Sequence, residues 1–447
     1  MPEMAAPAPG LATDQFDQAD LASAAHKRIR QDKPVVVIGG GVVGLCTAHY
    51  LADAGVPVVV TERVKLASGA SWANAGWVCL SHSAPVPAPG VTRYGLRSLG
   101  RPESPLYLRP SADPRFLAWL WRFWRSTDER TFRRGYAAIA ELNRTTFDLF
   151  GGLADAGVET TLRRPGLVHA FLSAQEASRY LEMQRMMAAG RYEVPDEIVL
   201  GDEAHRLDPA LSPQVQAAYL VRGEGVLDPR RLVGSLATVV RKAGGQIHEG
   251  ATVAGFRRLA GRVAAVQTSI GEIACSAVVI AAGMWSHRLL RQLGHRLPLQ
   301  AGKGYSFGVD LDPAPRHALY FADRRIVASP FGAATRLAGT MELSGDNRQL
   351  NWRRIIAIAR GSRHYLGRWF DDHEELPRLI HDPWVGGRPL LPDGLPVLDR
   401  VPGYDNAYVA TGHGMLGVTL APASGRALAD FLLTGRRPQE LAPFRFR

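Results

Sequence analysis

The sequence contains no uninterrupted apolar run of the roughly 18 residues that a membrane-spanning helix needs. Its most apolar stretches, residues 35–38 and 277–282, have the length of strands and lead into glycine. The segment before them, residues 1–33, is rich in Ala, Pro, Asp and Gln and lacks the apolar core of a secretory signal. These absences exclude a transmembrane protein and predict a flexible N-terminal extension before a globular body.

Lysine is also scarce, since only Lys27, Lys33, Lys65, Lys242 and Lys303 occur among 53 basic residues. The other 48 (53 − 5) are arginines, which lie mostly singly or in pairs and form no long basic block. The net charge is +11 and the isoelectric point about 9.8, yet this scatter does not indicate a nucleic-acid-binding surface. It favours acidic ligands or anionic surfaces as partners.

Cysteine occurs only at Cys46, Cys79 and Cys275, far apart and without CxxC spacing. Neither a disulfide framework nor a zinc site is therefore indicated, and no metal is expected. This cysteine usage fits a reducing compartment, and we expect a cytoplasmic protein.

The 447 residues, 46% of them hydrophobic, suffice for two or three domains. Residues 35–38 form a β-branched apolar run typical of a strand buried on both faces. A helical pattern follows at residues 45–54, and residues 56–60 form a second apolar run. This order predicts a parallel βαβ unit.

The first strand and the helix are joined by the sequence GGGVVG, which matches the GxGxxG pattern. Gly39 permits a tight turn, Gly41 lets a pyrophosphate approach the backbone, and Gly44 lets helix and strand pack closely. The pyrophosphate then lies at the helix N-terminus, where free N–H groups favour an anion. Glu62 ends the second strand, where a carboxylate accepts hydrogen bonds from ribose hydroxyls and disfavours NADP. The unit predicts a dinucleotide site and leaves FAD and NAD open.

Further motifs follow in a particular order along the chain. They are SGASWANAG at residues 68–76, a proline-rich stretch at 84–90, GKGYS at 302–306, GRP at 387–389, PDGLP at 392–396 and TGHGMLG at 411–417. Together with residues 35–63, this series resembles the D-amino-acid oxidase and glycine oxidase superfamily. The ANAG turn and the proline-rich stretch resemble the small-subunit type of bacterial D-amino-acid dehydrogenases. The resemblance spans residues 34–436 and implies FAD as the cofactor.

The resemblance also implies an α/β fold with a discontinuous, Rossmann-like FAD-binding domain and a substrate domain with a largely antiparallel sheet. We expect the FAD-binding domain from residues 34–95, 226–298 and 381–436. The substrate domain is then formed by residues 96–225 and 299–380, with a C-terminal tail at 437–447. The FAD is expected to be non-covalent, because no cysteine occurs near Arg388, where sarcosine oxidases attach the flavin.

Three residues are expected to act in catalysis. By resemblance, Arg388 binds the substrate carboxylate, which a planar guanidinium can hold with two hydrogen bonds. Tyr305 closes over the substrate or hydrogen-bonds to its carboxylate, and His413 tunes the charge near the flavin. Arg324 or Arg325 lies where relatives often place a tyrosine on the substrate side, which favours an acidic or unusual side chain.

The remaining site residues are expected to contact FAD. The turn before the last helix would direct the backbone amides of Met415 and Leu416 at the flavin, where they stabilise negative charge on reduction. Asn74 tolerates a left-handed backbone, and small neighbours allow close approach. The full set of expected cofactor contacts is Gly39, Gly41, Val43, Gly44, Glu62, Arg63, Ser71, Asn74, Ala75, Gly76, Val253, Ala282, Gly283, Gly387, Gly412, Gly414, Met415, Leu416 and Gly417.

The expected reaction is oxidative deamination of a D-amino acid by hydride transfer to the flavin, giving a 2-oxo acid and ammonia. Oxygen or a quinone would reoxidise the flavin. Oxidation of a secondary amine of the sarcosine, hydroxyproline or opine type is an alternative, and so is a non-catalytic flavoprotein subunit of an oligomer. The sequence leaves the oligomeric state open.

A segment rich in aromatic residues, FLAWLWRFWR at residues 116–125, interleaves aromatic rings with arginine. Such a stripe suits a helix that packs between domains with its arginines reaching solvent. It also suits peripheral contact with the inner face of the cell membrane. Both interpretations are kept.

Overall fold

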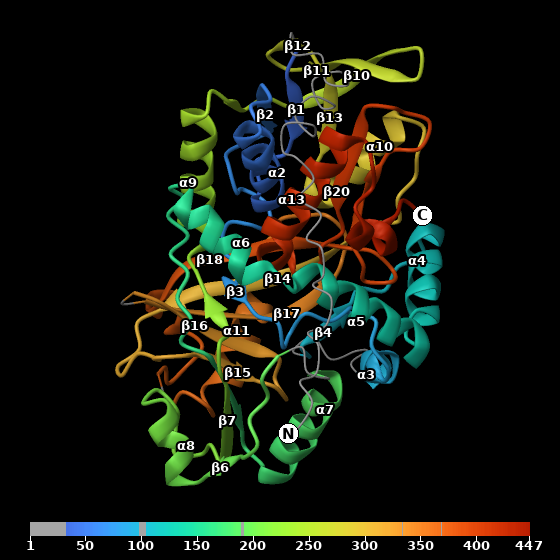
Figure 1. Ribbon diagram of the computed structural model, residues 1–447. Helices are drawn as coiled ribbons and strands as arrows, with labels where there is room; N and C mark the ends of the chain where they lie inside the picture. Colours follow the sequence, from blue (N-terminus) through green and yellow to red (C-terminus); the bar gives the residue numbers. More distant parts are fainter. Residues whose placement is uncertain (1–32, 98–103, 189–191, 333, 368) are drawn as a thin grey trace, which may run out of the picture.

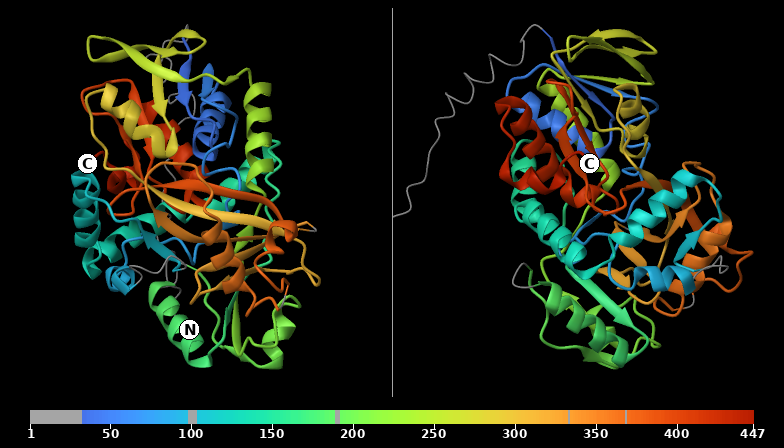
Figure 2. Two further views of the ribbon diagram at one scale, coloured as in Figure 1. Left: turned by 180° about the vertical axis from the view of Figure 1, so that it is seen from behind. Right: turned by 90° about the vertical axis from the view of Figure 1, so that its right-hand side faces the viewer.

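The computed structural model describes residues 33–97, 104–188, 192–332, 334–367 and 369–447. The N-terminal extension predicted at residues 1–33 thus lies outside the described residues, apart from Lys33. The described chain folds around two large β-sheets that lie next to each other (Figures 1 and 2). No helix in these ranges combines the length and apolarity needed to cross a bilayer.

The predicted βαβ unit is confirmed as part of a six-stranded sheet. Its strand order is β19-β20-β13-β1-β2-β9, with all pairs parallel except β19 and β20. The strands are β1 (Val35–Ile38), β2 (Val58–Glu62), β9 (Gln246–Glu249), β13 (Ala277–Ile280), β19 (Val397–Arg400) and β20 (Ala407–Thr411). The apolar runs are buried on both faces, as their uninterrupted hydrophobicity predicted.

Each face of this sheet is covered. One face packs on α2 (Val42–Asp53), α9 (Pro229–Lys242) and α13 (Gly417–Thr434). The other face packs on α10 (Ser286–Gln292) and on a three-stranded sheet. That small sheet is formed by β10 (Val253–Leu259), β11 (Arg262–Thr268) and β12 (Gly271–Ala274).

The second sheet has nine strands and is mostly antiparallel, as expected. Its order is β18-β14-β17-β16-β15-β5-β7-β6, and β4 pairs with β17. The strands are β4 (Leu106–Leu108), β5 (Leu167–Phe171), β6 (Val199–Leu200), β7 (Ala217–Val221), β14 (Gln300–Val309), β15 (Ala318–Phe321), β16 (Ile326–Phe331), β17 (Ala334–Leu343) and β18 (Ile380–Leu390). A two-stranded ladder, β3 (Trp77–Val78) with β8 (Gly225–Val226), lies between the two large sheets in Figure 1.

The other helices surround this framework. They are α3 (Val91–Arg97), α4 (Pro114–Arg125), α5 (Glu129–Asn143), α6 (Thr146–Asp155), α7 (Ala174–Ala188), α8 (Asp202–Leu207), α11 (Trp352–Ser362) and α12 (Leu376–Leu379), with short 3-10 turns η1 (Gly283–Trp285) and η2 (Gln439–Phe444). One face of the second sheet packs on α11 and encloses a core that includes Phe307 and Phe321.

The course of the chain between the two sheets differs from the expected domain division in two places. The expected boundary at 380/381 falls at the start of β18, which pairs with β14 along its length in the nine-stranded sheet. Helices α5 and α6, which the sequence assigned to the substrate domain, instead bury Ile139 and Phe150 in the core of the first sheet. The turn η2, in the expected C-terminal tail, also packs into this core. The division into domains itself stays a prediction.

The crossing of α2 and α13 depends on a glycine. A Cβ atom at Gly425 of α13 would lie 2.8 Å from the backbone of Cys46 in α2. We expect Gly425→Ala to lower the free energy of unfolding by about 1–3 kcal/mol, because neither backbone can give way in this packed core. Gly234→Ala is the matched control: Gly234 lies in α9 with open space around it, so alanine should leave stability unchanged or raise it by up to about 1 kcal/mol. Urea unfolding followed by circular dichroism measures both, and equal stability of the two variants would contradict this packing.

Candidate active site

A cavity of about 1870 Å³ lies where the two large sheets meet. Its lining comes from the carboxyl ends of β1 and β2, from η1, from the start of α13 and from β14, β17 and β18. Sites for drug-sized ligands usually measure about 300–1,000 Å³, so this cavity has room for a dinucleotide and a small substrate. Of the expected site residues, all except Gly44 and Gly412 line it.

The glycine turn after β1 is held in the shape that an anion site requires. Gly39 has φ +121°, and a Cβ there would lie 2.4 Å from the carbonyl oxygen of Ala281. Gly44 faces the turn itself, because its Cβ would lie 2.1 Å from the carbonyl oxygen of Gly39. The Val42 N–H donates to Ser71 Oγ at 3.1 Å, and Gly41 and Val43 border the cavity. The N-terminus of α2 therefore opens into the cavity with its positive dipole end.

Glu62 lies beside this turn at the end of β2. Its Oε2 accepts from the Gly40 N–H at 2.9 Å and its Oε1 from the Val64 N–H at 3.1 Å. Each carboxylate oxygen can accept a second hydrogen bond, and Glu62 borders the cavity. Next to it, the Arg63 guanidinium lies over the Trp285 ring, 4.5 Å from the centroid.

The Asn74–Gly76 turn forms another part of the wall. Asn74 Oδ1 accepts from the Gly76 N–H at 2.8 Å, and Asn74 Nδ2 donates to the Ala70 carbonyl at 3.0 Å. Gly76 has φ +67°, and a Cβ there would lie 2.0 Å from the Leu227 carbonyl oxygen. The left-handed backbone expected at Asn74 lies instead at Gly76, and Asn74 shapes the turn through the hydrogen bonds of its side chain.

The turn before α13 differs from expectation in one detail. The Leu416 N–H donates to the carbonyl of His413 at 2.8 Å, so this amide already has a protein acceptor. The cavity is instead bordered by the first turn of α13, residues Gly417–Thr419, whose N–H groups have no acceptor within the helix. Gly412 does not line the cavity, and a Cβ there would lie 2.5 Å from the Leu391 side chain. The positive end of α13 is the electrostatic feature that reaches the cavity.

His413 is buried and its Nε2 lies 3.0 Å from Ser424 Oγ. Burial lowers the pKa of His413 to about 4. The imidazole is therefore neutral at pH 7 and brings no positive charge to the cavity. The expected role of His413 in catalysis stays a prediction. A mechanism that requires a positively charged imidazole at this position is disfavoured.

Arg388 is a cation in the cavity without an acidic partner. Its Nη1 donates to the carbonyl of Thr340 at 2.9 Å, and among the described residues it forms no ion pair. A Cβ at Gly304 would lie 2.3 Å from the Arg388 Cζ, so only glycine leaves room for the guanidinium across β14. Burial lowers the pKa of Arg388 to about 10, which still leaves the side chain charged at pH 7. A desolvated cation without a counter-ion favours an anionic ligand.

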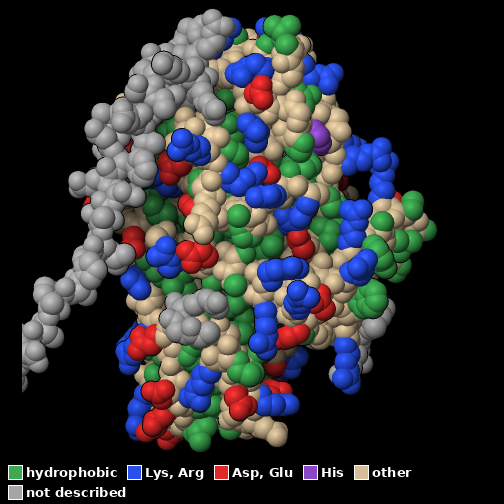
Figure 3. Space-filling model, turned by 45° about the vertical axis from the view of Figure 1, so that its right-hand side comes forward, with side chains coloured by type: hydrophobic (Ala, Val, Ile, Leu, Met, Phe, Trp, Pro, Cys, Tyr) green, Lys and Arg blue, Asp and Glu red, His purple; other side chains and the backbone are tan. Residues whose placement is uncertain are grey.

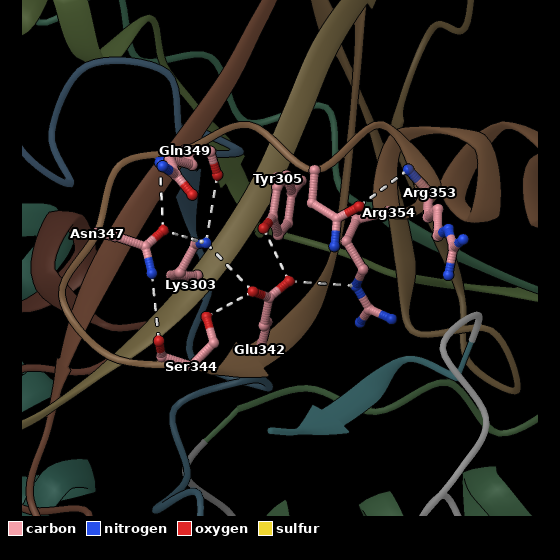
Figure 4. Close-up of polar contacts among 9 residues, drawn as sticks. Lys303, Tyr305, Glu342, Ser344, Asn347, Gln349, Arg353 and Arg354 are labelled. Atoms are coloured by element: carbon pink, nitrogen blue, oxygen red, sulfur yellow. Dashed lines mark hydrogen bonds and ion pairs between the residues drawn. The ribbon is translucent and has the colours of Figure 1, made fainter. Parts of the chain in front are cut away.

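Tyr305 is adjacent to Gly304 but belongs to a different environment. Its ring is buried in the core on the other face of the sheet, and its hydroxyl donates to Glu342 Oε2 at 2.8 Å (Figure 4). Successive side chains in a strand point to opposite faces, which separates Tyr305 from the face that Gly304 leaves to Arg388. This geometry does not bring the Tyr305 hydroxyl to Arg388, and its catalytic role stays a prediction that the contact with Glu342 disfavours.

Glu342 is the centre of a buried polar network (Figure 4). Its Oε1 lies 3.2 Å from Lys303 Nζ and accepts from Ser344 Oγ at 2.5 Å, and its Oε2 lies 3.9 Å from Arg354 Nε. Burial opposes ionisation, but the hydrogen bonds from Ser344 and Tyr305 and the Lys303 ammonium keep the pKa of Glu342 below its usual value. The network joins β14 to β17 two residues from Thr340, which has φ +58°.

Other residues of the cavity could not be singled out from the sequence. Thr340, Ala338 and Tyr320 face it only because of the strand register. Alternation within predicted strands was the available signal, but it required knowledge of which strands are neighbours. Of the two arginines considered for the substrate side, Arg325 borders the cavity, whereas Arg324 is exposed and lies 3.2 Å from Asp323.

No three metal-ligating side chains come together in the part of the chain that the structure describes. The features on the cavity wall suit a dinucleotide such as FAD: glycines at positions with no room for a Cβ, two helix N-termini for anionic groups and a carboxylate at the end of β2. They define a dinucleotide-binding protein, and comparison with known families identifies the class as FAD-dependent oxidoreductases. The chain belongs to the DAO family of FAD dependent oxidoreductases, whose family model matches residues 34–431.

Individual relatives narrow the comparison. The chain is similar to a D-amino acid dehydrogenase of Methylobacterium nodulans, with 33% identity over 91% of this chain and 96% of that protein. It is 32% identical to a D-amino acid dehydrogenase of Xanthobacter autotrophicus over 90% of this chain and 96% of that protein. Among solved structures, glycine oxidase from Bacillus cereus has the same fold, with a TM-score of 0.67 and 22% identity over 93% of this chain and 99% of that one.

The two interpretations of Tyr305 can be separated by Tyr305→Phe. We expect it to lower the free energy of unfolding by about 1–3 kcal/mol, because one hydrogen bond to a buried carboxylate is lost. The ratio kcat/KM should change less than threefold, because the hydroxyl does not face Arg388. Thermal unfolding and steady-state kinetics of the holoenzyme provide the two measurements. A large loss of kcat/KM with unchanged stability would restore Tyr305 to the catalytic residues.

Proposed function

We propose that this FAD-dependent oxidoreductase catalyses the oxidative deamination of D-amino acids. The observation that carries the proposal is the Arg388 guanidinium, a desolvated cation that lacks an acidic partner among the described residues and faces a cavity large enough for FAD and a substrate. The names of the curated relatives support the same substrate class. The overall change converts the D-amino acid and water into a 2-oxo acid and ammonia, and two electrons and two protons pass to the flavin.

The chain's own groups bind and orient the substrate. Arg388 pairs with the carboxylate, and the Thr340 carbonyl and the space above Gly304 fix the guanidinium before substrate arrives. Bound FAD supplies the hydride acceptor. The first turn of α13 faces the cavity with its positive dipole end and favours negative charge that develops there. A neutral His413 neither repels the substrate ammonium nor competes for its carboxylate.

Replacement of Arg388 tests this proposal. We expect Arg388→Ala to lower kcat/KM for D-amino acids by about 10²-fold or more, because a desolvated ionic contact with substrate is lost. Arg388→Lys should recover only part of the loss, because an ammonium cannot reproduce the planar fork. Arg324→Ala is the control, since Arg324 is exposed outside the cavity lining.

The measurement is reduction of enzyme-bound flavin without oxygen, with D- and L-amino acids, sarcosine and hydroxyproline as substrates. An Arg388→Ala variant that keeps its flavin and its kcat/KM would contradict the carboxylate site. Reduction by secondary amines alone would replace the proposed substrate class with the alternative one. Readmission of air to the reduced enzyme then separates an oxidase from a dehydrogenase that needs a quinone.

We also infer that the protein docks on an anionic membrane surface through α4. Leu117, Trp121 and Trp124 are 51%, 54% and 57% exposed and repeat at helical spacing on one face. Exposed arginines accompany them, and the Arg125 guanidinium lies over the Trp121 ring at 5.0 Å. Hydrophobic side chains stand beside Lys and Arg side chains at the right-hand edge of Figure 3. Aromatic and basic side chains together favour the interface of anionic lipids.

Flotation with vesicles tests this docking. The protein should float with vesicles rich in phosphatidylglycerol, and the double variant Trp121→Ser, Trp124→Ser should lose most of this binding because the exposed rings are removed. Leu200→Ser removes another exposed apolar side chain, 55% exposed and remote from α4 in sequence, and should bind as wild type. Equal flotation of all three proteins, or none by the wild type, would contradict the docking.

A further inference from the structure

One end of the cavity is formed by aromatic side chains from separate parts of the chain. We call Trp77, His82, Tyr180 and Tyr320 the aromatic wall, and all four border the cavity. The His82 and Tyr320 ring centroids are 4.7 Å apart, those of Trp77 and Tyr320 5.9 Å, and those of Tyr180 and Tyr320 6.2 Å. Neither the carboxylate site nor the expected cofactor contacts include these residues.

Two more rings, those of His169 and Tyr219, pack against the aromatic wall on the side of His82. His169 is fully buried and stacks on Tyr219, with centroids 4.7 Å apart, and its Nε2 lies 3.4 Å from His82 Nε2. Two histidines in such contact cannot both be protonated, and burial lowers the pKa of His82 to about 4 and that of His169 below its usual value. The wall is therefore uncharged at pH 7. The basic residue Arg325 also borders the cavity, but it is exposed to solvent.

A path of small side chains leads from the carboxylate site to this wall. Ser306, Ala338, Val327 and Tyr320 are cross-strand neighbours on β14, β17, β16 and β15, and all border the cavity. The Arg388 guanidinium reaches β17, where the Thr340 carbonyl accepts from it. Strands lie about 4.8 Å apart, so β15 is roughly 10 Å across the sheet from β17. An alanine methyl group covers little of that distance, whereas an aromatic side chain covers more than half of it and approaches Tyr320, which borders the cavity.

We propose that the aromatic wall and the path over Ala338 and Val327 form the side-chain subsite, and that it selects D-amino acids with neutral aromatic or large apolar side chains. This inference rests on the proposed function, because the carboxylate must bind at Arg388. The wall offers ring faces and edges for stacking. Among the residues that the structure describes, no acidic side chain that would hold a basic substrate borders the cavity beside it. A charged side chain would have to lose its hydration against uncharged rings, which opposes binding.

The experiment compares D-phenylalanine, D-alanine, D-glutamate and D-lysine as substrates of the holoenzyme. Burial of a benzyl group should give D-phenylalanine a kcat/KM about 10- to 100-fold above that of D-alanine, and the two charged substrates should be poorer than D-phenylalanine. Tyr320→Ala and Ala338→Leu, which remove the wall or obstruct the path, should each lower the D-phenylalanine to D-alanine ratio about tenfold. Phe321→Leu is the matched control: Phe321 follows Tyr320 on β15 but stacks on Tyr365 in the opposite core, so this ratio should not change.

A binding measurement tests the side-chain subsite without catalytic turnover. The probes are 3-phenylpropanoate and propanoate, which carry the carboxylate but no amine to be oxidised. The larger probe should perturb the flavin spectrum at a concentration about tenfold lower, and Ala338→Leu should abolish the difference. Equal affinity of the two probes, or a preference for D-glutamate or D-alanine, would overturn the subsite while leaving oxidative deamination intact. If no D-amino acid reduces the flavin, the proposed function fails, and the probe comparison still decides whether the subsite exists.

Discussion

The electrostatic constraint on this molecule is the Arg388 guanidinium, a desolvated charge that forms no ion pair with the described residues. Such a charge is tolerated only if the surroundings fix it and a ligand completes its coordination. The protein supplies the first condition with Gly304 beneath the guanidinium and with the backbone carbonyl of Thr340, a residue of β17 that has a left-handed φ. In the proposed function the substrate carboxylate supplies the second, so binding energy and orientation would come from the same contact.

The two faces of the nine-stranded sheet have different roles, because one packs into a core and the other lines the cavity. On one face, Tyr305 and Phe307 pack into a core, and the Lys303–Glu342 ion pair joins neighbouring strands. On the other face, Gly304, Ser306 and Ala338 are small and leave space for ligands. A motif such as GKGYS is therefore bifunctional, because alternate residues stabilise the sheet and open the cavity. Polar side chains that look catalytic in the sequence can belong to the stabilising set.

Features of the site that depend on neighbouring residues in the sequence could be predicted, whereas contacts between residues far apart in the sequence could not. The turn from Gly39 to Gly44 and the acid at Glu62 follow from short-range stereochemistry, and the fold follows from the order of several motifs. Tyr305 could not be assigned to a face, because a β-bulge and the identity of the neighbouring strand decide it. The expected contact of the Leu416 amide with the flavin stays a prediction, but the hydrogen bond of this amide to the His413 carbonyl is a detail of turn geometry that the sequence could not indicate. The aromatic wall depends on strand order, which no motif records.

The order of strands in the first sheet has a consequence for biosynthesis. Strands β1 and β2 leave the ribosome early, but β13, which pairs with β1, and helix α13, which packs on α2, are translated hundreds of residues later. A nascent chain therefore carries an apolar parallel pair with an unpaired edge until β13 has been made. Strand pairs that are distant in the sequence form slowly, and hydrophobic surface stays exposed until they form. The first sheet can therefore be completed only after β13, β20 and α13 have been made, and until then its early apolar strands are open to wrong pairing.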